Sequence, residues 1–184
     1  RNASVGAYGS VAIDLIITVF ILLFSLNFAV YFLLLTRKWR EALSSDELRF
    51  FLLVVTGATI LIAIDIAPLY TSIWESLRYS VFQVASIIST TGFATADFVL
   101  WPHFSQTILV LLMFCGACAG STGGGIKCSR VLILLRSIRR EIHRVIHPRS
   151  VEVVKLDGKV VEEDTLRSIS VFVGSYLFII LAAP

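Results

Sequence analysis

The chain has 184 residues, of which 57% are hydrophobic and only 16% are charged, and its formal net charge is +3. Soluble domains typically contain about 45–50% apolar and about 25% charged residues, so this composition excludes an ordinary soluble domain and indicates a membrane protein. Three cysteines are an odd number in so apolar a chain, which argues against a disulfide framework.

Apolar runs define the predicted membrane-spanning segments. They occupy residues 11–35, 50–70, 104–135 and a last run from about residue 169. The hydrocarbon core is ~30 Å thick and a helix needs about 20 residues to cross it, so the first three runs are predicted to be spans. The chain starts at Arg1 without an initiator methionine and stops at Pro184 inside the last run, so we expect it to be a piece of a longer protein.

The distribution of Lys and Arg predicts the orientation of these spans. Four of them lie in residues 36–49 and six in residues 130–149. Arg78 is the only Lys or Arg in residues 71–103. This stretch is therefore predicted to lie outside, because basic loops stay on the cytoplasmic side. Within them residues 74–88 are expected to be helical, yet at ~1.5 Å per residue this helix reaches only ~22 Å. We therefore expect a re-entrant loop, in which a short helix enters the membrane and the chain returns extended.

The segment after this short helix has the composition of an ion filter, with the sequence STTGFAT from Ser89. The C-terminal end of a helix carries about half a negative charge, which favours a cation. We expect the backbone carbonyls of Thr90, Thr91 and Gly92 to bind potassium, with Ser89 and Phe93 completing the filter and Phe93 bracing it from behind. The order of residues matches the potassium-filter sequence TVGYG apart from its last glycine. The alternative is a polar loop between two spans.

A glycine-rich stretch, CGACAGSTGGGIKCSR at residues 115–130, interrupts the third span. Each glycine costs ~1 kcal/mol relative to alanine in a helix, so a break is predicted here. Irregular backbone at this depth must be buried or line a cavity, which makes the stretch a candidate gate below the filter. The predicted gating loop comprises Gly116, Gly120, Ser121, Thr122, Gly123, Gly124, Gly125 and Lys127. Lys127 is expected near the inner end, where it either repels ions or tethers the loop.

Other chemistries fit the glycine-rich stretch less well. A P-loop needs a lysine directly after its last glycine, but Ile126 stands there. Cys115 and Cys118 have redox-like spacing, which small packing residues in an apolar helix also explain. Ser121 lacks the G-x-S-x-G context of a hydrolase nucleophile because Ala119 replaces the first glycine. We expect no enzyme, and the remaining alternative is a membrane enzyme or receptor that uses the glycine-rich loop as a ligand site.

Five motifs make the chain resemble a known family. They are NFAVYFLL at residues 27–34, SIISTTGFATADF at residues 86–98, WPHFSQ at residues 101–106, GACAGSTGGGIKCSR at residues 116–130 and IHPRSVEVVKLDGKVV at residues 146–161. Together they resemble the Trk/Ktr/HKT potassium uptake proteins, and among these the bacterial Trk membrane subunit. The resemblance implies an all-α membrane protein of M1–pore loop–M2 repeats of potassium-channel type, with one full repeat here and parts of its two neighbours.

The resemblance also implies a division of the chain. Residues 1–49 correspond to the second-repeat M2 helix and a cytosolic loop, 50–147 to the third repeat, 148–165 to a cytosolic hairpin and 166–184 to the start of the fourth-repeat M1. Alternating residues around the turn pair Asp157 and Gly158 independently predict the hairpin. Acidic residues 162–164 are expected to stabilise the start of the last span.

The function that the resemblance implies is potassium uptake by a multi-pass protein of the plasma (inner) membrane. Potassium is then the transported ion, no other cofactor is expected, and the interrupted M2 closes the pore beneath the filter. The implied partners are membrane lipid, a second copy in a homodimer and a cytosolic nucleotide-binding regulatory ring, with no nucleic acid. The basic stretch 130–147, with its apolar stripe, fits anionic lipid and partner docking equally. Selectivity between potassium and sodium stays open, since relatives with serine at the position of Gly92 lean toward sodium.

Overall fold

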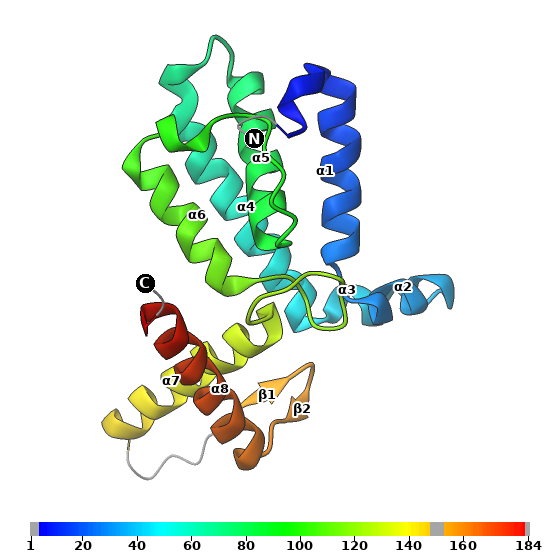
Figure 1. The fold of residues 1–184 in the computed structure, drawn as a ribbon. Coiled ribbons are helices and arrows are strands. Elements are labelled where there is room, and N and C mark those ends of the chain that lie inside the picture. Colours follow the sequence, from blue (N-terminus) through cyan, green and yellow to red (C-terminus); the bar gives the residue numbers. More distant parts are fainter. Residues whose placement is uncertain (1–3, 148–152, 183–184) are drawn as a thin grey trace.

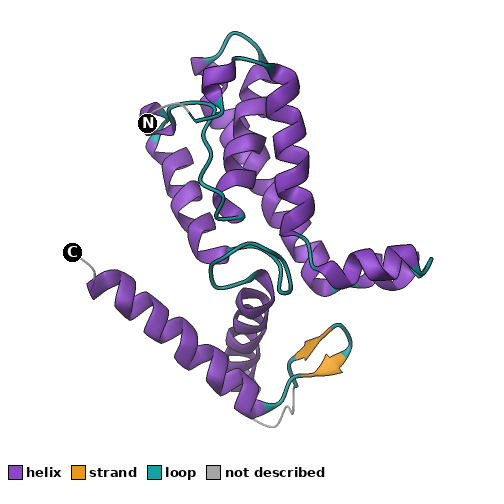
Figure 2. Ribbon diagram, turned by 45° about the vertical axis from the view of Figure 1, so that its right-hand side comes forward, coloured by secondary structure: helices purple, strands orange, loops and turns teal. Residues whose placement is uncertain are grey.

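The computed structural model describes residues 4–147 and 153–182, which form helices and one short hairpin (Figures 1 and 2). The helices are α1 (Val11–Ser25), α2 (Phe28–Leu35), α3 (Trp39–Ser44), α4 (Asp46–Ile66), α5 (Ile73–Ile88), α6 (His103–Cys115), α7 (Cys128–Ile146) and α8 (Glu163–Ala182), with 3₁₀ turns at Gly6–Tyr8, Ala67–Leu69 and Phe98–Leu100. Strands β1 (Lys155–Leu156) and β2 (Lys159–Val160) pair antiparallel. In Figure 1, α1, α4, α5 and α6 stand side by side, and α2 projects sideways from their lower end.

Helix α4 with the turn that follows it is the clearest membrane span. Together they cover Asp46–Leu69, 24 residues, the one stretch of the described residues that is by itself long and apolar enough to cross a membrane. Helix α6 is apolar but shorter, because the glycine-rich stretch ends it at Cys115. The predicted second span is therefore confirmed as a helix, and the third is interrupted as predicted.

The predicted span over residues 11–35 is sharply bent and is not a single straight helix. Helices α1 and α2 meet at a bend of 92°. At the bend Leu26 is extended, and the Asn27 side chain caps α2 by accepting a 2.9 Å hydrogen bond from the backbone N–H of Ala29. The hydropathy of this stretch shows that it is apolar, but hydropathy carries no information about a change of helix direction.

Helix α5 is the predicted short helix, displaced by one residue from the expected start. The Ser72 side chain caps it by accepting from the N–H of Trp74. Neighbouring helices surround it, so its polar side chains are buried, and Ser76 donates a 2.6 Å hydrogen bond to the Ala63 carbonyl of α4. A buried ion pair of 3.7 Å between Arg78 and Asp14 ties α5 to α1. These contacts let a helix too short to span stay inside the bundle.

Two apolar clusters hold the molecule together. The first joins α4, α5 and α6 through Phe51, Val55, Ile62, Ile66, Val84, Ile88, Leu109 and Leu112. The second joins α7, α8 and the hairpin segment through Ile126, Ile133, Val154, Leu166, Ile169 and Val173. The return strand starts at the lower end of α5 and runs upward beside the bundle, and the glycine-rich stretch lies at the lower end of the bundle (Figure 2).

The hairpin is seated on the lower end of α4. Asp157 occupies the turn with φ +49° and accepts a 2.6 Å hydrogen bond from the N–H of Asp46, while Asp46 accepts from the N–H of Asp157 at 3.1 Å. Arg136 of α7 forms a 2.8 Å ion pair with Asp46. The predicted turn at Asp157 and Gly158 is confirmed, although part of the predicted first strand lies outside the described residues.

Helix α8 begins earlier than its apolar run. Glu163 and Asp164 occupy its first turn, where negative charge is favourable, as the sequence predicted. Arg140 of α7 pairs with Glu163 at 2.6 Å, and this hydrogen bond raises the pKa of Arg140 above its usual value. The pair fixes the start of α8 against α7.

Candidate ion pathway

The strand that returns from α5 turns its N–H groups toward that helix. The N–H groups of Thr91 and Gly92 both donate to the Ser86 carbonyl, at 3.0 and 3.3 Å, and the N–H of Thr90 donates to the Ile87 carbonyl at 3.0 Å. The backbone φ is +61° at Thr90 and +76° at Gly92, with an ordinary negative φ between them. Because the C=O and N–H of a trans peptide point in opposite directions, the carbonyls of Thr90 and Thr91 point away from α5.

The carbonyls on that side have no partner in the protein. Among the described residues, none donates a hydrogen bond to the carbonyl of Thr90, Thr91 or Gly92, whereas the Phe93 carbonyl accepts from the Ser86 hydroxyl at 2.6 Å. Backbone carbonyls are strong acceptors that need a partner away from water. A row of free carbonyls beside the C-terminal end of α5 is suited to a cation.

Thr90 is held in a strained conformation by its neighbours. A positive φ is a genuine outlier for a β-branched residue and costs about 1–3 kcal/mol. The Thr90 hydroxyl donates to the Ser89 carbonyl at 2.6 Å and accepts from the backbone N–H of Gly124 at 2.8 Å. Strain of this kind persists only where the surroundings determine it, and these two hydrogen bonds hold Thr90 in place.

The upper end of the strand is fixed by the segment that precedes α1. The Ala94 carbonyl accepts from the N–H groups of Val5 and Gly6, at 3.2 and 3.1 Å, and the N–H of Ala94 donates to the Ser4 hydroxyl at 2.8 Å. A Cβ at Gly6 would lie 2.7 Å from the Thr95 carbonyl oxygen, so the two backbones approach as closely as only glycine allows.

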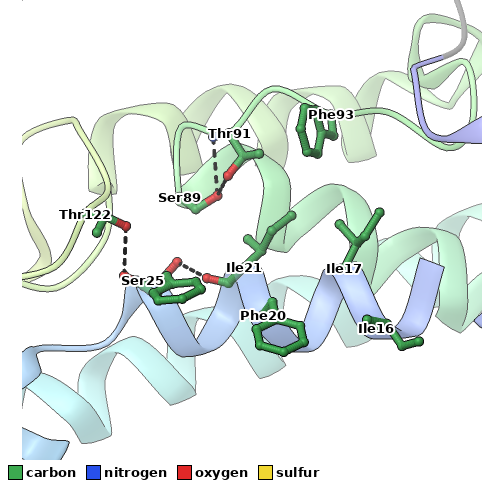
Figure 3. Close-up of a pocket in the computed structure, with 10 residues that line it drawn as sticks. Ile16, Ile17, Phe20, Ile21, Ser25, Ser89, Thr91, Phe93 and Thr122 are labelled. Atoms are coloured by element: carbon green, nitrogen blue, oxygen red, sulfur yellow. Dashed lines mark hydrogen bonds between the residues drawn. The ribbon is translucent and has the colours of Figure 1, made fainter. Parts of the chain in front are cut away.

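A cavity of about 510 Å³ separates the strand from α1 (Figure 3). The cavity is lined by Ile16, Ile17, Phe20, Ile21, Phe24 and Ser25 of α1 together with Ser89, Thr91, Phe93 and Thr122. Phe93 faces this cavity and is 43% exposed, so the prediction that it packs behind the strand is wrong. The space behind the strand is already filled by buried α5 side chains such as Ser86. The cavity is apolar along α1 and has hydroxyl groups at its lower end.

The predicted gating loop, residues 116–127, joins α6 to α7 without helical structure. Gly116 follows the last residue of α6 with a positive φ and ends the helix, and Gly120 and Gly125 within the loop also have positive φ. The loop lies directly under the strand: a Cβ at Gly123 would be 2.6 Å from the Cβ of Ala117 and 3.1 Å from the Ser89 carbonyl oxygen. Glycine at this point therefore lets the loop contact the lower end of the strand.

The breaks in the two spans complement each other. The last carbonyls of α1 accept from the loop, since Phe24 receives a 3.3 Å hydrogen bond from the N–H of Thr122 and Ser25 receives a 3.1 Å bond from the N–H of Cys118. In return the N–H of Phe28, at the start of α2, donates to the Gly120 carbonyl at 3.2 Å. The backbone groups at helix ends lack partners within the helix and need partners elsewhere in a membrane. Here the loop supplies donors to the end of α1 and an acceptor to the start of α2.

Two charged side chains fix the loop. Lys127 donates from its ammonium group to the Gly123 carbonyl within the loop, so in this structure it tethers the loop. Glu47, which the sequence reading missed, is buried at the start of α4 and accepts from the N–H of Ala119 at 2.6 Å. The sequence feature that could have pointed to Glu47 is a carboxylate directly before an apolar span.

The serine and cysteine side chains considered for other chemistries in the glycine-rich stretch are hydrogen-bonded within the loop or buried. The Ser121 hydroxyl donates to the Cys118 carbonyl at 2.5 Å, inside the loop. Cys115 lies with its Sγ atom 3.7 Å from that of Cys128, and both thiols are buried. In the ranges that the structure describes, no group of three or more His, Cys, Asp or Glu side chains is arranged to hold a metal ion.

A helical bundle with a long apolar helix, a short buried helix and an interrupted apolar run indicates an all-α membrane protein. The chain belongs to the TrkH family, described as a cation transport protein, whose match covers residues 1–184. This confirms the family resemblance and the all-α membrane fold that it implies.

Individual relatives agree with this assignment. The chain is 34% identical over 187 residues to the Trk system potassium uptake protein TrkH of Halomonas elongata, covering 97% of this chain and 38% of that protein. It is 34% identical over 178 residues to TrkG of Escherichia coli, covering 96% and 37%. The crystal structure of the potassium transporter TrkH from Vibrio parahaemolyticus superposes with a TM-score of 0.89 at 31% identity, covering 99% of this chain and 40% of that one. The chain thus spans about 38% of the length of the curated relatives it matches.

Proposed function

We propose that this chain forms part of a potassium uptake channel of the plasma (inner) membrane. The observation that carries the proposal is the row of free carbonyls at Thr90, Thr91 and Gly92, flanked by Ser89 and Phe93. Carbonyl oxygens can replace the hydration shell of a potassium ion, which is how a filter passes the ion without a charged side chain. The relatives named as potassium uptake proteins support the choice of ion.

One strand cannot surround an ion, so the complete transporter must supply more strands. The chain covers only about 38% of its relatives, which fits the proposed division into parts of three repeats. In that division residues 1–49 belong to the second repeat, 50–147 to the third, 148–165 to the cytosolic hairpin and 166–184 to the fourth. Inward flow is then driven by the membrane potential, worth ~2.3 kcal/mol per charge per 100 mV.

Residues 116–127 act as the gate in this proposal. An ion that leaves the strand at its inner end meets the loop, because Gly123 and Gly124 lie directly against Ser89 and Thr90. The loop is irregular and bonded to side chains and helix ends rather than wound into helix, so it can move without unwinding a span. A homodimeric assembly, contact with membrane lipid and control by a cytosolic nucleotide-binding ring complete the proposal. The exposed apolar side chains of α7, such as Ile138 and Ile142, are compatible with lipid or partner contact.

Growth at low potassium tests the proposed function. The complete gene is expressed in a bacterium that lacks its own potassium uptake systems, and growth is compared with Ser121→Ala and Cys118→Ala variants. We expect the wild type and both variants to restore growth, because neither side chain supplies a carbonyl of the strand. A wild type that fails to restore growth, although present in the membrane, contradicts potassium uptake. Loss of function in both variants favours the alternative of a ligand site or enzyme in the glycine-rich loop.

A further inference from the structure

Glu47 is a buried carboxylate at the start of α4. It lies in the first turn of α4, is 6% exposed, and forms no ion pair in the described part of the chain. A buried charge is stable only where hydrogen bonds replace its water. Its Oε1 atom accepts two backbone hydrogen bonds, from Ala119 at 2.6 Å and from Ser129 at 3.2 Å, and Asn27 donates to Oε2 at 3.4 Å.

The two backbone donors come from opposite sides of the gating loop. Ala119 lies in the first part of the loop, after α6 ends at Cys115, and Ser129 is the second residue of α7. The N–H of Ser129 is one of the unpaired groups at the start of α7, where negative charge is also favourable. A single oxygen atom of Glu47 therefore holds the incoming and outgoing ends of the loop together.

We propose that Glu47 is the positioning residue that holds residues 116–127 across the ion pathway. This inference rests on the gating role proposed above for the loop. The connection to the strand is short: Ala119 is two residues from Ala117, which packs against Gly123, and Gly124 bonds to the Thr90 hydroxyl. Withdrawing the Glu47 oxygen leaves two partly buried N–H groups without their acceptor and so favours conformations in which the loop leaves its position.

Two substitutions distinguish the effect of the length of the Glu47 side chain from the effect of its charge. Glu47→Asp keeps the charge but shortens the side chain by one methylene, which withdraws the oxygens from Ala119 and Ser129. Glu47→Gln removes the charge but keeps the reach, and its amide oxygen can accept both backbone hydrogen bonds. Glu41→Asp is the matched control, because Glu41 lies nearby on α3 with a side chain that is 61% exposed.

Hydrogen exchange in the complete transporter measures the position of the loop directly. In Glu47→Asp we expect the amides of residues 116–130 to exchange about tenfold faster than in the wild type. In Glu47→Gln and Glu41→Asp we expect rates within about threefold of the wild type. Exchange at the wild-type rate in Glu47→Asp overturns the inference. Equal acceleration in Glu47→Asp and Glu47→Gln also overturns it, because the acceptor position would then not be what holds the loop.

Passive potassium flux from vesicles containing the same proteins gives the second measurement. The leak through Glu47→Asp is expected to exceed that of the wild type by about tenfold, with Glu47→Gln close to the wild type. A loosened loop with an unchanged leak contradicts the proposed position across the pathway. If the wild type itself transports no potassium, the proposed function fails, and the exchange rates still decide whether Glu47 holds the loop.

Discussion

The hydroxyl oxygen of Thr90 accepts a 2.8 Å hydrogen bond from the backbone N–H of Gly124, which joins the lower end of the carbonyl strand to the glycine-rich loop. The two residues are 34 positions apart and belong to the return strand and to the interrupted span. Because Thr90 also carries the positive φ of +61°, the loop supports the strained part of the strand. Any movement of the loop away from the strand must first break this bond.

Replacing Thr90 tests this connection. Thr90→Val keeps the shape of the side chain but removes the hydroxyl, so the N–H of Gly124 and the carbonyl of Ser89 lose their partner. We expect Thr90→Val to lower the free energy of unfolding by about 0.5–1.5 kcal/mol. Thr90→Ser retains the hydroxyl and is expected to stay within about 0.5 kcal/mol of the wild type. Thermal unfolding of the purified complete protein in detergent measures both, and equal stability of Thr90→Val and Thr90→Ser would show that the bond contributes nothing.

The contact between Gly123 and Ala117 predicts one destabilising substitution and a second substitution that partly reverses its effect. A methyl group at Gly123 would lie 2.6 Å from the Cβ of Ala117 in the same loop and 3.1 Å from the Ser89 carbonyl oxygen, so Gly123→Ala must distort the loop where it contacts the strand. We expect a loss of about 1–3 kcal/mol in stability, together with a raised potassium leak. Adding Ala117→Gly removes the clashing methyl and is expected to recover part of both.

Gly57→Ala is the matched control for that substitution. A methyl group at Gly57, inside α4, meets no heavy atom within 4 Å, and alanine favours a helix. It is expected to leave stability unchanged or to raise it by up to about 1 kcal/mol. Failure of Ala117→Gly to improve Gly123→Ala would mean that the loop does not pack as this structure has it.

The sequence predicted the short helix and the break well, because both have local causes. The helix predicted at residues 74–88 was found at Ile73–Ile88, and the glycines between Gly116 and Gly125 end α6 where their intrinsic cost predicts. Free carbonyls at Thr90, Thr91 and Gly92 agree with the predicted filter, although their ion-binding role remains a prediction.

The features that the sequence did not predict depend on contacts between distant segments. The bend at Leu26 and Asn27 lies in an apolar run, and it is stabilised by hydrogen bonds from the loop about 90 residues later. Glu47 belongs to no motif, and its role depends on donors 72 and 82 positions away. Phe93 was placed behind the strand because its neighbours on α1 were unknown. Local propensity carries no information about such partners.

The hairpin contact at the lower end of α4 can be tested separately from the pathway. Asp157 combines φ +49° with a hydrogen bond from the N–H of Asp46, and asparagine can satisfy both requirements. We expect Asp157→Ala to destabilise this contact by about 1–2 kcal/mol and Asp157→Asn to cost about 0.5 kcal/mol or less. Limited proteolysis of the hairpin in inside-out vesicles measures the difference, and equally slow cleavage of Asp157→Ala and the wild type would contradict the predicted contact.

The central claim is that the strand from Ser89 to Phe93 selects the ion, and Gly92 gives its most direct test. A methyl group at Gly92 meets no heavy atom within 4 Å, so Gly92→Ala acts only by disfavouring φ +76° and thereby the direction of the carbonyl. Gly158→Ala is the matched control, because Gly158 has φ +77°, equally open surroundings and a position in the hairpin.

The measurement is the permeability ratio of potassium to sodium in vesicles that contain the complete transporter. We expect Gly92→Ala to reduce this ratio by about tenfold, equivalent to about 1.4 kcal/mol between the two ions, while Gly158→Ala keeps the wild-type ratio. An unchanged ratio in Gly92→Ala, with the protein present and conducting, would contradict the account and leave the strand as a loop between two spans.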